Sequence, residues 1–164
     1  MPSKAPINSV KHYVQTSLSA VTAGSIANIV FADSVNVPGT GNAQVKDGSV
    51  LKAAYIELWL MQASAAVGSF TFTVMKAPGG LPLPATGDLA NINDYENKKN
   101  ILFTSMGLSP PNDTYPTNVI RQHVLIPKGK QRMGLGDQLI YSIRNNNGAD
   151  DINYCGFVTY KEYQ

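Results

Sequence analysis

The chain has 164 residues and a mass of 17.6 kDa, enough for one domain whose core needs no disulfides. Charged residues make up only 15%, against about 25% in an average protein, and the net charge is +2. These values exclude a polycation of the histone type but allow a local basic patch. The single cysteine, Cys155, excludes an intramolecular disulfide framework and a cysteine-rich zinc site.

No apolar run approaches the roughly twenty residues that a membrane helix needs, so no membrane partner is expected. The first six residues have no apolar stretch of the signal-peptide kind. We therefore expect a soluble intracellular product. Neutral polar residues take the place of the missing charges. This composition suits a protein whose sides are covered by other subunits, because a buried neutral group needs only a hydrogen-bond partner.

A two-residue hydrophobic period, typical of β-strands, runs through most of the chain. In chain order, strands are predicted over residues 11–19, 25–32, 50–61, 69–75, 99–106, 119–126, 138–144 and 152–163.

The strongest of these elements is 50–61, where Tyr55 to Met61 alternate between two faces and Leu58 lies on the face opposite Trp59. A helix through 51–55 is the competing interpretation, since Ala and Leu favour helices.

Long connections rich in Gly and Pro are predicted over 35–49, 77–89 and 107–117, with at most one short helix, over 88–97. No sequence period repeats, which excludes solenoids and propellers. The pattern predicts an all-β fold, an antiparallel β-sandwich of the jelly-roll or immunoglobulin-like kind. We divide the chain into a flexible N-terminal segment, 1–9, and a sandwich domain, 10–164.

Large apolar side chains fall on strand faces that should point to solvent in a lone sandwich, namely Trp59, Met61, Phe157 and Ile140. Exposed apolar groups of this size are typical of subunit contacts. We therefore predict a subunit interface at Trp59, Met61 and Phe157, unless the assigned faces are off by one residue.

Catalytic motifs are absent from the sequence: no nucleophile elbow, zinc-binding helix motif, Walker loop or dinucleotide fingerprint is present. His12 and His123 lie in separate predicted strands, where hydrogen-bonded structural roles are expected. The acidic pair Asp150 and Asp151 fits a solvated turn better than a calcium site, which needs six or more oxygens. We expect no catalytic residue, metal or cofactor, and no enzymatic activity.

Basic residues cluster in three places, and such clusters can neutralise phosphates, although each is also compatible with a solvated turn. The candidate nucleic-acid-binding residues are Lys4, Lys11, Lys98, Lys99, Lys128, Lys130 and Arg132.

Three stretches of the chain, 126–137, 55–60 and 157–163, resemble capsid proteins of small circular single-stranded DNA viruses. The resemblance implies a single jelly roll that self-assembles in many copies into an icosahedral capsid around a single-stranded DNA genome. It implies location in the virion, and inside the host cell during assembly. A host receptor is also implied, but no residue is assigned to it.

The family usually begins with an arginine-rich arm that packages the genome, whereas the first twelve residues here offer only Lys4 and Lys11. Binding of viral DNA is therefore expected to be weak and sensitive to salt. The alternatives are a carbohydrate-binding β-sandwich module, with Tyr95, Tyr115 and Tyr163 stacking on sugars, and a trimeric phage tail or fibre component.

Overall fold

Strands make up most of the computed structural model, which describes residues 8–63, 67–79, 99–109 and 118–164. The strands of this part are β1 Ser9–Val21, β2 Ile26–Val35, β3 Gln44–Lys46, β4 Val50–Gln62, β5 Gly68–Ala77, β6 Ile101–Ser109, β7 Asn118–Leu125, β8 Gln138–Asn145 and β9 Ile152–Tyr163. A 3₁₀ turn, η2 Lys128–Lys130, lies between β7 and β8. The predicted all-β fold is confirmed.

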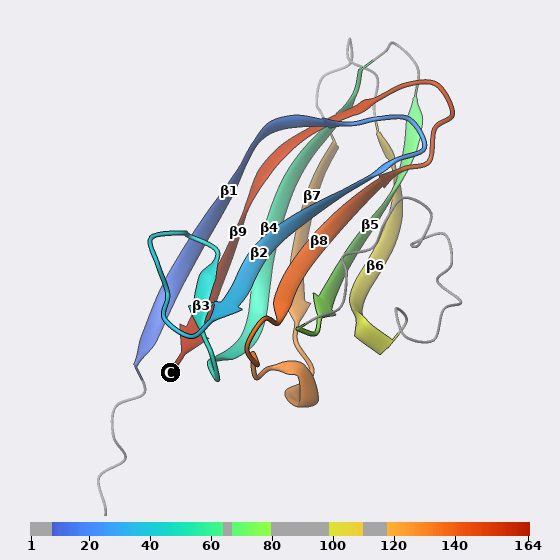
Figure 1. Ribbon diagram of the computed structural model, residues 1–164. Coiled ribbons are helices and arrows are strands. Elements are labelled where there is room, and N and C mark those ends of the chain that lie inside the picture. Colours follow the sequence, from blue (N-terminus) through green and yellow to red (C-terminus); the bar gives the residue numbers. More distant parts are fainter. Residues whose placement is uncertain (1–7, 64–66, 80–98, 110–117) are drawn as a thin grey trace, which may run out of the picture.

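Two sheets form the sandwich, one of four strands in the order β1-β9-β4-β7 and one of five in the order β3-β2-β8-β5-β6 (Figure 1). Every pair is antiparallel except β2 with β3. When β3 is set aside, all connections except the one between β5 and β6 cross from one sheet to the other. Eight long strands connected in this order form a jelly roll, which decides between the two sandwich types.

Alternate residues of each strand fill the space between the sheets, as the period of two predicts. From β4, Ile56, Leu58 and Leu60 are fully buried, whereas the alternate residues Tyr55 and Trp59 are half-buried on the outer side. The helical interpretation of 51–55 is therefore wrong. Each fully buried side chain of this size contributes about 1.5–3 kcal/mol through removal of apolar area from water.

An aromatic cluster from the five-stranded sheet faces the four-stranded sheet across the core. The ring centroids of Phe31 and Phe72 lie 6.4 and 6.0 Å from that of Tyr141. The Tyr141 hydroxyl is 2.7 Å from the hydroxyl of Thr16 in β1. Because a buried hydroxyl needs a partner, this bond joins the two sheets. Burial raises the pKa of Tyr141 well above its usual value, so the phenol stays neutral.

Three predicted elements differ from the structure, and one of them is the loop predicted over 107–117, whose first three residues belong to β6. The loop predicted over 35–49 contains β3, whose three residues pair in parallel with the end of β2. The strand predicted from Lys99 begins instead at Ile101, because Lys99 and Asn100 are helical. The helix predicted over 88–97 and most of the flexible segment 1–9 lie outside the described residues, and both stay predictions.

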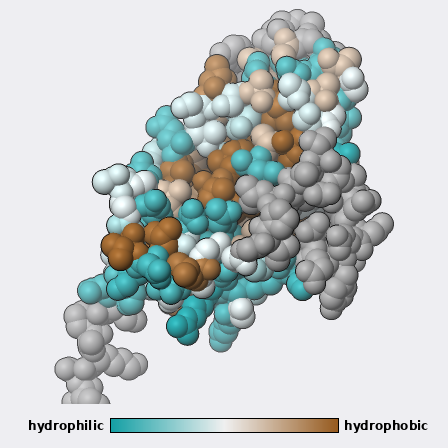
Figure 2. Space-filling view, in the orientation of Figure 1, coloured by the Kyte–Doolittle hydropathy of each residue, from teal (hydrophilic) through white to brown (hydrophobic). Residues whose placement is uncertain are grey.

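Apolar side chains also reach the surface of the sandwich. Figure 2 shows hydrophobic residues gathered in the middle of one face, between hydrophilic ones. Ile140 lies on the outer side of the five-stranded sheet, as predicted, but is fully buried, so it offers no contact area.

Candidate functional site

The outer side of the four-stranded sheet carries a continuous group of aromatic rings, which we call the aromatic face: Tyr13, Tyr55, Trp59 and Phe157. Phe157 of β9 is at its centre, with ring centroids at 5.2 Å from Tyr13, 6.2 Å from Tyr55 and 6.0 Å from Trp59. The face forms because β1, β4 and β9 are neighbours, and their odd-numbered residues here point away from the core.

Tyr13 is the most accessible of these rings, with 51% of its surface exposed. It stacks on Phe157 with an angle of 24° between the ring planes. One side of the Tyr13 ring is supported by Phe157, and much of the rest of the side chain is open to solvent. A supported, exposed ring can stack on a flat ligand with little loss of side-chain freedom.

Three lysines lie side by side at one end of this sheet, and we call them the lysine row: Lys11, Lys161 and Lys52. Lys11 of β1 is directly opposite Lys161 of β9. On the other side of Lys161, the register of β4 with β9 shifts between Leu51 and Ala54, so that Lys52 lies in this irregularity. All three side chains are exposed.

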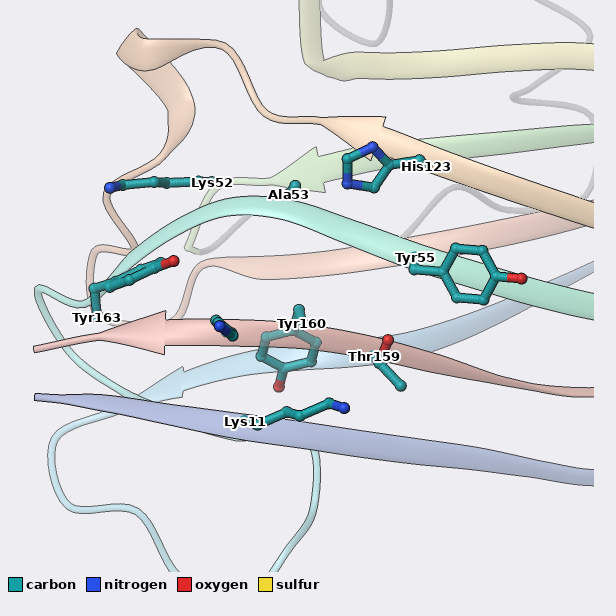
Figure 3. Close-up of a pocket in the computed structure, with 9 residues that line it drawn as sticks. Lys11, Lys52, Ala53, Tyr55, His123, Thr159, Tyr160 and Tyr163 are labelled. Atoms are coloured by element: carbon teal, nitrogen blue, oxygen red, sulfur yellow. The ribbon is translucent and has the colours of Figure 1, made fainter.

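A shallow pocket of about 260 Å³ is lined by the lysine row together with Tyr55, His123, Thr159 and Tyr163 (Figure 3). The Lys52 Nζ is 4.5 Å from the centroid of the Tyr163 ring, a cation–π contact. Side chains from all four strands of the sheet meet here. The pocket therefore combines positive charge with aromatic surface.

The positive charge of the lysine row is not neutralised within the described part of the chain. No carboxylate there lies within salt-bridge distance of Lys11, Lys52 or Lys161. Like charges on directly opposite residues of a sheet destabilise it. Within the described part of the chain the row therefore carries positive charge that no acid offsets, and it suits an anionic ligand.

Glu57 is the carboxylate on the same outer side, and it is already engaged. It accepts a hydrogen bond of 2.7 Å from the Tyr55 hydroxyl and pairs with Arg121 Nε at 3.4 Å. The hydrogen bond to Glu57, followed by burial, raises the pKa of Tyr55. These contacts hold the Tyr55 ring in place beside the pocket.

Three of the remaining predicted basic residues fall in a second place, the loop 126–137 that contains η2. Lys128 and Arg132 are exposed, and Lys130 is half-buried. Burial, and then the charges of Lys76 and Lys99, lower the pKa of Lys130, so the structure brings Lys99 near this loop. Lys4 and Lys98 lie outside the described residues.

Backbone hydrogen bonds place this loop next to the lysine row. The Ile126 amide donates to the Lys52 carbonyl at 2.9 Å, and the Leu51 amide donates to the Gln131 carbonyl at 2.9 Å. Of the candidate nucleic-acid-binding residues, the structure places Lys11 in the lysine row. The other described candidates, Lys99, Lys128, Lys130 and Arg132, lie in or near the adjacent loop 126–137.

Sequence reasoning missed Lys52 and Lys161. A period of two puts Lys161 on the same side as Phe157, but it would put Lys52 on the core side with Leu58, and Lys52 is exposed where the register of β4 with β9 shifts. Their meeting with Lys11 depends on the order and register of β1, β9 and β4, and a period of two does not carry that information.

The predicted interface residues Trp59, Met61 and Phe157 do share one outer side. At the end away from the lysine row, Trp59 and Met61 line an apolar pocket of about 210 Å³ with Cys155 and Leu18, whose exposed fraction is 75%. The assigned strand faces are therefore confirmed. Their role in subunit contact stays a prediction.

The two histidines lie on opposite sides of the sheet. His12 points inward, with its Nε2 at 2.7 Å from Glu162 and its ring stacked on Tyr160 at 4.7 Å. His123 is exposed and paired with Tyr55 across β7 and β4. Among the described residues, no group of three or more His, Cys, Asp or Glu side chains could hold a metal ion, and no helix is long and apolar enough to cross a membrane.

No family model and no curated protein matches the sequence. Among solved structures, the chain is similar to MgGH51 α-L-arabinofuranosidase at a TM-score of 0.43 and 11% identity, covering 91% of this chain and 23% of that one. It is similar to turnip yellow mosaic virus at a TM-score of 0.38 and 9% identity, covering 97% and 96%. It is similar to desmodium yellow mottle tymovirus at 0.33 and 6%, covering 100% and 93%. Structural similarities with TM-scores and identities this low assign neither a family nor a function to the chain.

Proposed function

We propose that the chain is a viral coat protein whose copies assemble into a closed icosahedral shell around a single-stranded DNA genome. The observation that carries the proposal is the jelly roll with an aromatic, partly apolar outer side that packs against nothing within the described part of the chain. In an isolated sandwich, that side would be polar. Here it offers Trp59, Met61 and Phe157 to a neighbouring copy.

Assembly needs only modest contacts between subunits. Each contact buries apolar area worth about 25 cal/mol per Å², before the cost of association is subtracted. In a closed shell, symmetry repeats the same contact around every subunit, so a weak pair interaction becomes a stable particle. The low charge content supports this proposal, because few charges have to be desolvated in each contact.

The choice of single-stranded DNA rests on the sequence resemblance in 126–137, 55–60 and 157–163. The proposal further places the protein in the virion, and in the host cell during assembly. It assigns the chain no enzymatic activity and no cofactor.

Size-exclusion chromatography combined with negative-stain electron microscopy tests the proposal directly. Purified protein is expected to give closed particles of uniform diameter at some combination of pH and ionic strength. A trimer under all conditions would instead indicate a fibre component, and a monomer would indicate a binding module. Either result would overturn the coat assignment.

A further inference from the structure

We propose that the lysine row and Tyr13, at the adjacent edge of the aromatic face, together form a binding site for single-stranded nucleic acid, in which phosphates lie along the lysines and a base stacks on the Tyr13 ring. This inference deepens the proposed function, because the ligand would be the enclosed genome. Its test, however, uses the unassembled subunit and does not depend on particles.

Charge complementarity selects the ligand. Lys11, Lys161 and Lys52 occupy neighbouring strands, which are about 4.8 Å apart in a sheet. No acid of the described residues pairs with them, so a bound anion would offset the repulsion between these like charges. Three charges in a line fit a polyanion with regularly spaced charges better than one isolated anion.

The aromatic surface beside the row selects a single strand over other polyanions. Tyr13 is two residues from Lys11 on the same side of β1, about 7 Å along the strand. A chain whose phosphate contacts Lys11 can therefore place the next base near the exposed Tyr13 ring. In a duplex the faces of the bases are already stacked and are not available to this ring, whereas single strands bind platforms of basic and aromatic residues.

The pocket geometry agrees with this arrangement. Tyr55 is held by its hydrogen bond to Glu57, and Tyr163 is held under the Lys52 ammonium group. Neither ring has to be ordered when the ligand arrives, which lowers the entropic cost of binding. The lining side chains come from all four strands of the sheet, so a bound strand can contact several of them in turn (Figure 3).

The test measures the fluorescence anisotropy of a labelled oligothymidylate with unassembled subunit over a range of salt concentrations. Three phosphate contacts on a single strand predict a slope of log K against log salt of about −2. The triple variant Lys11→Gln, Lys52→Gln, Lys161→Gln is expected to bring the slope close to zero and to lower the affinity at least tenfold at low salt. Its melting temperature should not fall, since repulsion within the sheet is removed.

A second triple variant, Lys128→Gln, Lys130→Gln, Arg132→Gln, removes the same charge from the neighbouring loop, whose basic residues are the competing candidates. If the lysine row carries the site, this variant loses less affinity than the first. Equal losses in both triple variants would show that only net charge matters, and would overturn the site. Unchanged binding in the first variant would overturn it as well.

Stacking is tested separately with Tyr13→Thr, which keeps a residue suited to an exposed strand. An oligonucleotide containing 2-aminopurine should lose fluorescence on binding the unsubstituted protein and keep it with the variant. Duplex DNA of equal length and heparin should bind more weakly than the single strand. If either binds as tightly, or if Tyr13→Thr leaves the fluorescence change intact, the platform is wrong. Oligouridylate in the same assay shows whether the site distinguishes RNA from DNA.

Failure of this inference is distinguishable from failure of the proposed function. If particles form but the lysine-row variant binds nucleic acid as well as the unsubstituted protein, the coat assignment stands and the site is overturned. Row-dependent binding by a subunit that never assembles would support the site and overturn the coat assignment.

Discussion

Gly156 shows how much one residue can constrain the sheet that carries the site. It is directly opposite Leu58 where β9 pairs with β4. A Cβ at this position would run into the Glu57 carbonyl oxygen and lie 2.9 Å from the Leu58 Cα. Backbone atoms cannot move aside as the end of a flexible side chain can, so the close approach of these two strands requires glycine here.

We predict that Gly156→Ala destabilises the subunit by at least about 2 kcal/mol, because overpacking a sheet displaces backbone as well as side chains. Urea denaturation followed by circular dichroism measures the change. Gly129→Ala is the matched control, since a Cβ there meets nothing within 4 Å, and it should stay within about 0.5 kcal/mol. Similar stabilities for both variants would contradict the predicted clash.

Glu162 is a buried carboxylate held by several donors at the end of β9. It accepts hydrogen bonds from the Ser49 hydroxyl and from the Lys46 amide at 2.9 Å, and its other oxygen is 2.7 Å from His12 Nε2. Burial raises the pKa of Glu162, but the bonds from Ser49, Lys46 and His12 lower it more, so the net pKa is below 4.5.

A carboxyl group with a lowered folded-state pKa stabilises the protein above its unfolded pKa, and this contribution is lost as the pH falls through the folded pKa. We therefore predict that Glu162→Gln is less stable than the unsubstituted protein by about 1–3 kcal/mol at pH 7. The difference should shrink below pH 4.5. Thermal melts from pH 7 to pH 3 measure it. A difference that does not change with pH would show that the carboxylate charge plays no part.

Individual elements are tied together by a few buried polar contacts. Lys76 of β5 is only 9% exposed. Its Nζ pairs with Asp137 at 2.8 Å and donates to the carbonyls of Lys130 at 3.2 Å and Arg132 at 2.6 Å. Asp137 in turn accepts from the Gly134 amide at 2.9 Å. One ammonium group thus holds the loop that connects β7 to β8.

We predict that Lys76→Met destabilises the subunit by about 3 kcal/mol, because it leaves a carboxylate without its partner in a mostly buried place. The double variant Lys76→Met, Asp137→Asn should recover part of the lost stability, since it removes the unpaired carboxylate charge of Asp137. Urea denaturation of the two single variants and the double variant gives the coupling between the residues. Strictly additive effects would contradict the pairing.

Strands and their faces were predictable from the sequence because a strand with one buried side alternates inward-facing apolar residues with outward-facing ones. The 50–61 element shows this: the burial of Leu58 and the outward position of Trp59 follow from the period alone. β3 was not predictable, because its three residues lie among turn-forming residues and pair only through the end of β2. Local pattern determines an element only when the element is long enough to show a period.

The candidate site was only partly predictable, for a different physical reason. Lys11 was identified as a basic residue at the start of the chain, but its neighbours Lys161 and Lys52 are 150 and 41 positions away in the sequence. The jelly-roll order places β9 between β1 and β4. The lysine row is thus a product of topology.

At the scale of the whole molecule, the outer side of the four-stranded sheet has two ends of different character. Lys11, Lys52 and Lys161 are at one end, and the apolar pocket of Trp59 and Leu18 is at the other. Charged and apolar surfaces suit different partners, because phosphates keep their hydration beside lysines while apolar groups must lose theirs. We infer that nucleic acid binds at the first end and protein contact occurs at the second.

Trp59 provides the test of the apolar end, with Leu58 next to it on β4 as the internal comparison. Leu58 is fully buried, and Leu58→Ala should cost about 2–5 kcal/mol of subunit stability. Trp59 is half-buried on the outer side, with Phe157 as its ring neighbour at 6.0 Å. We predict that Trp59→Ala costs the subunit clearly less than Leu58→Ala but reduces assembly strongly, because the lost area belongs to the contact between copies.

The experiment measures two quantities on the same Trp59→Ala preparation. Urea denaturation at low protein concentration gives the stability of the subunit, and light scattering with negative-stain microscopy gives the yield of particles. A folded subunit with few particles is the expected result. If Trp59→Ala unfolds as readily as Leu58→Ala, the ring serves the subunit fold. If it assembles as well as the unsubstituted protein, the contact between copies lies elsewhere on the sandwich. The proposed nucleic-acid site at the lysine row does not depend on that outcome.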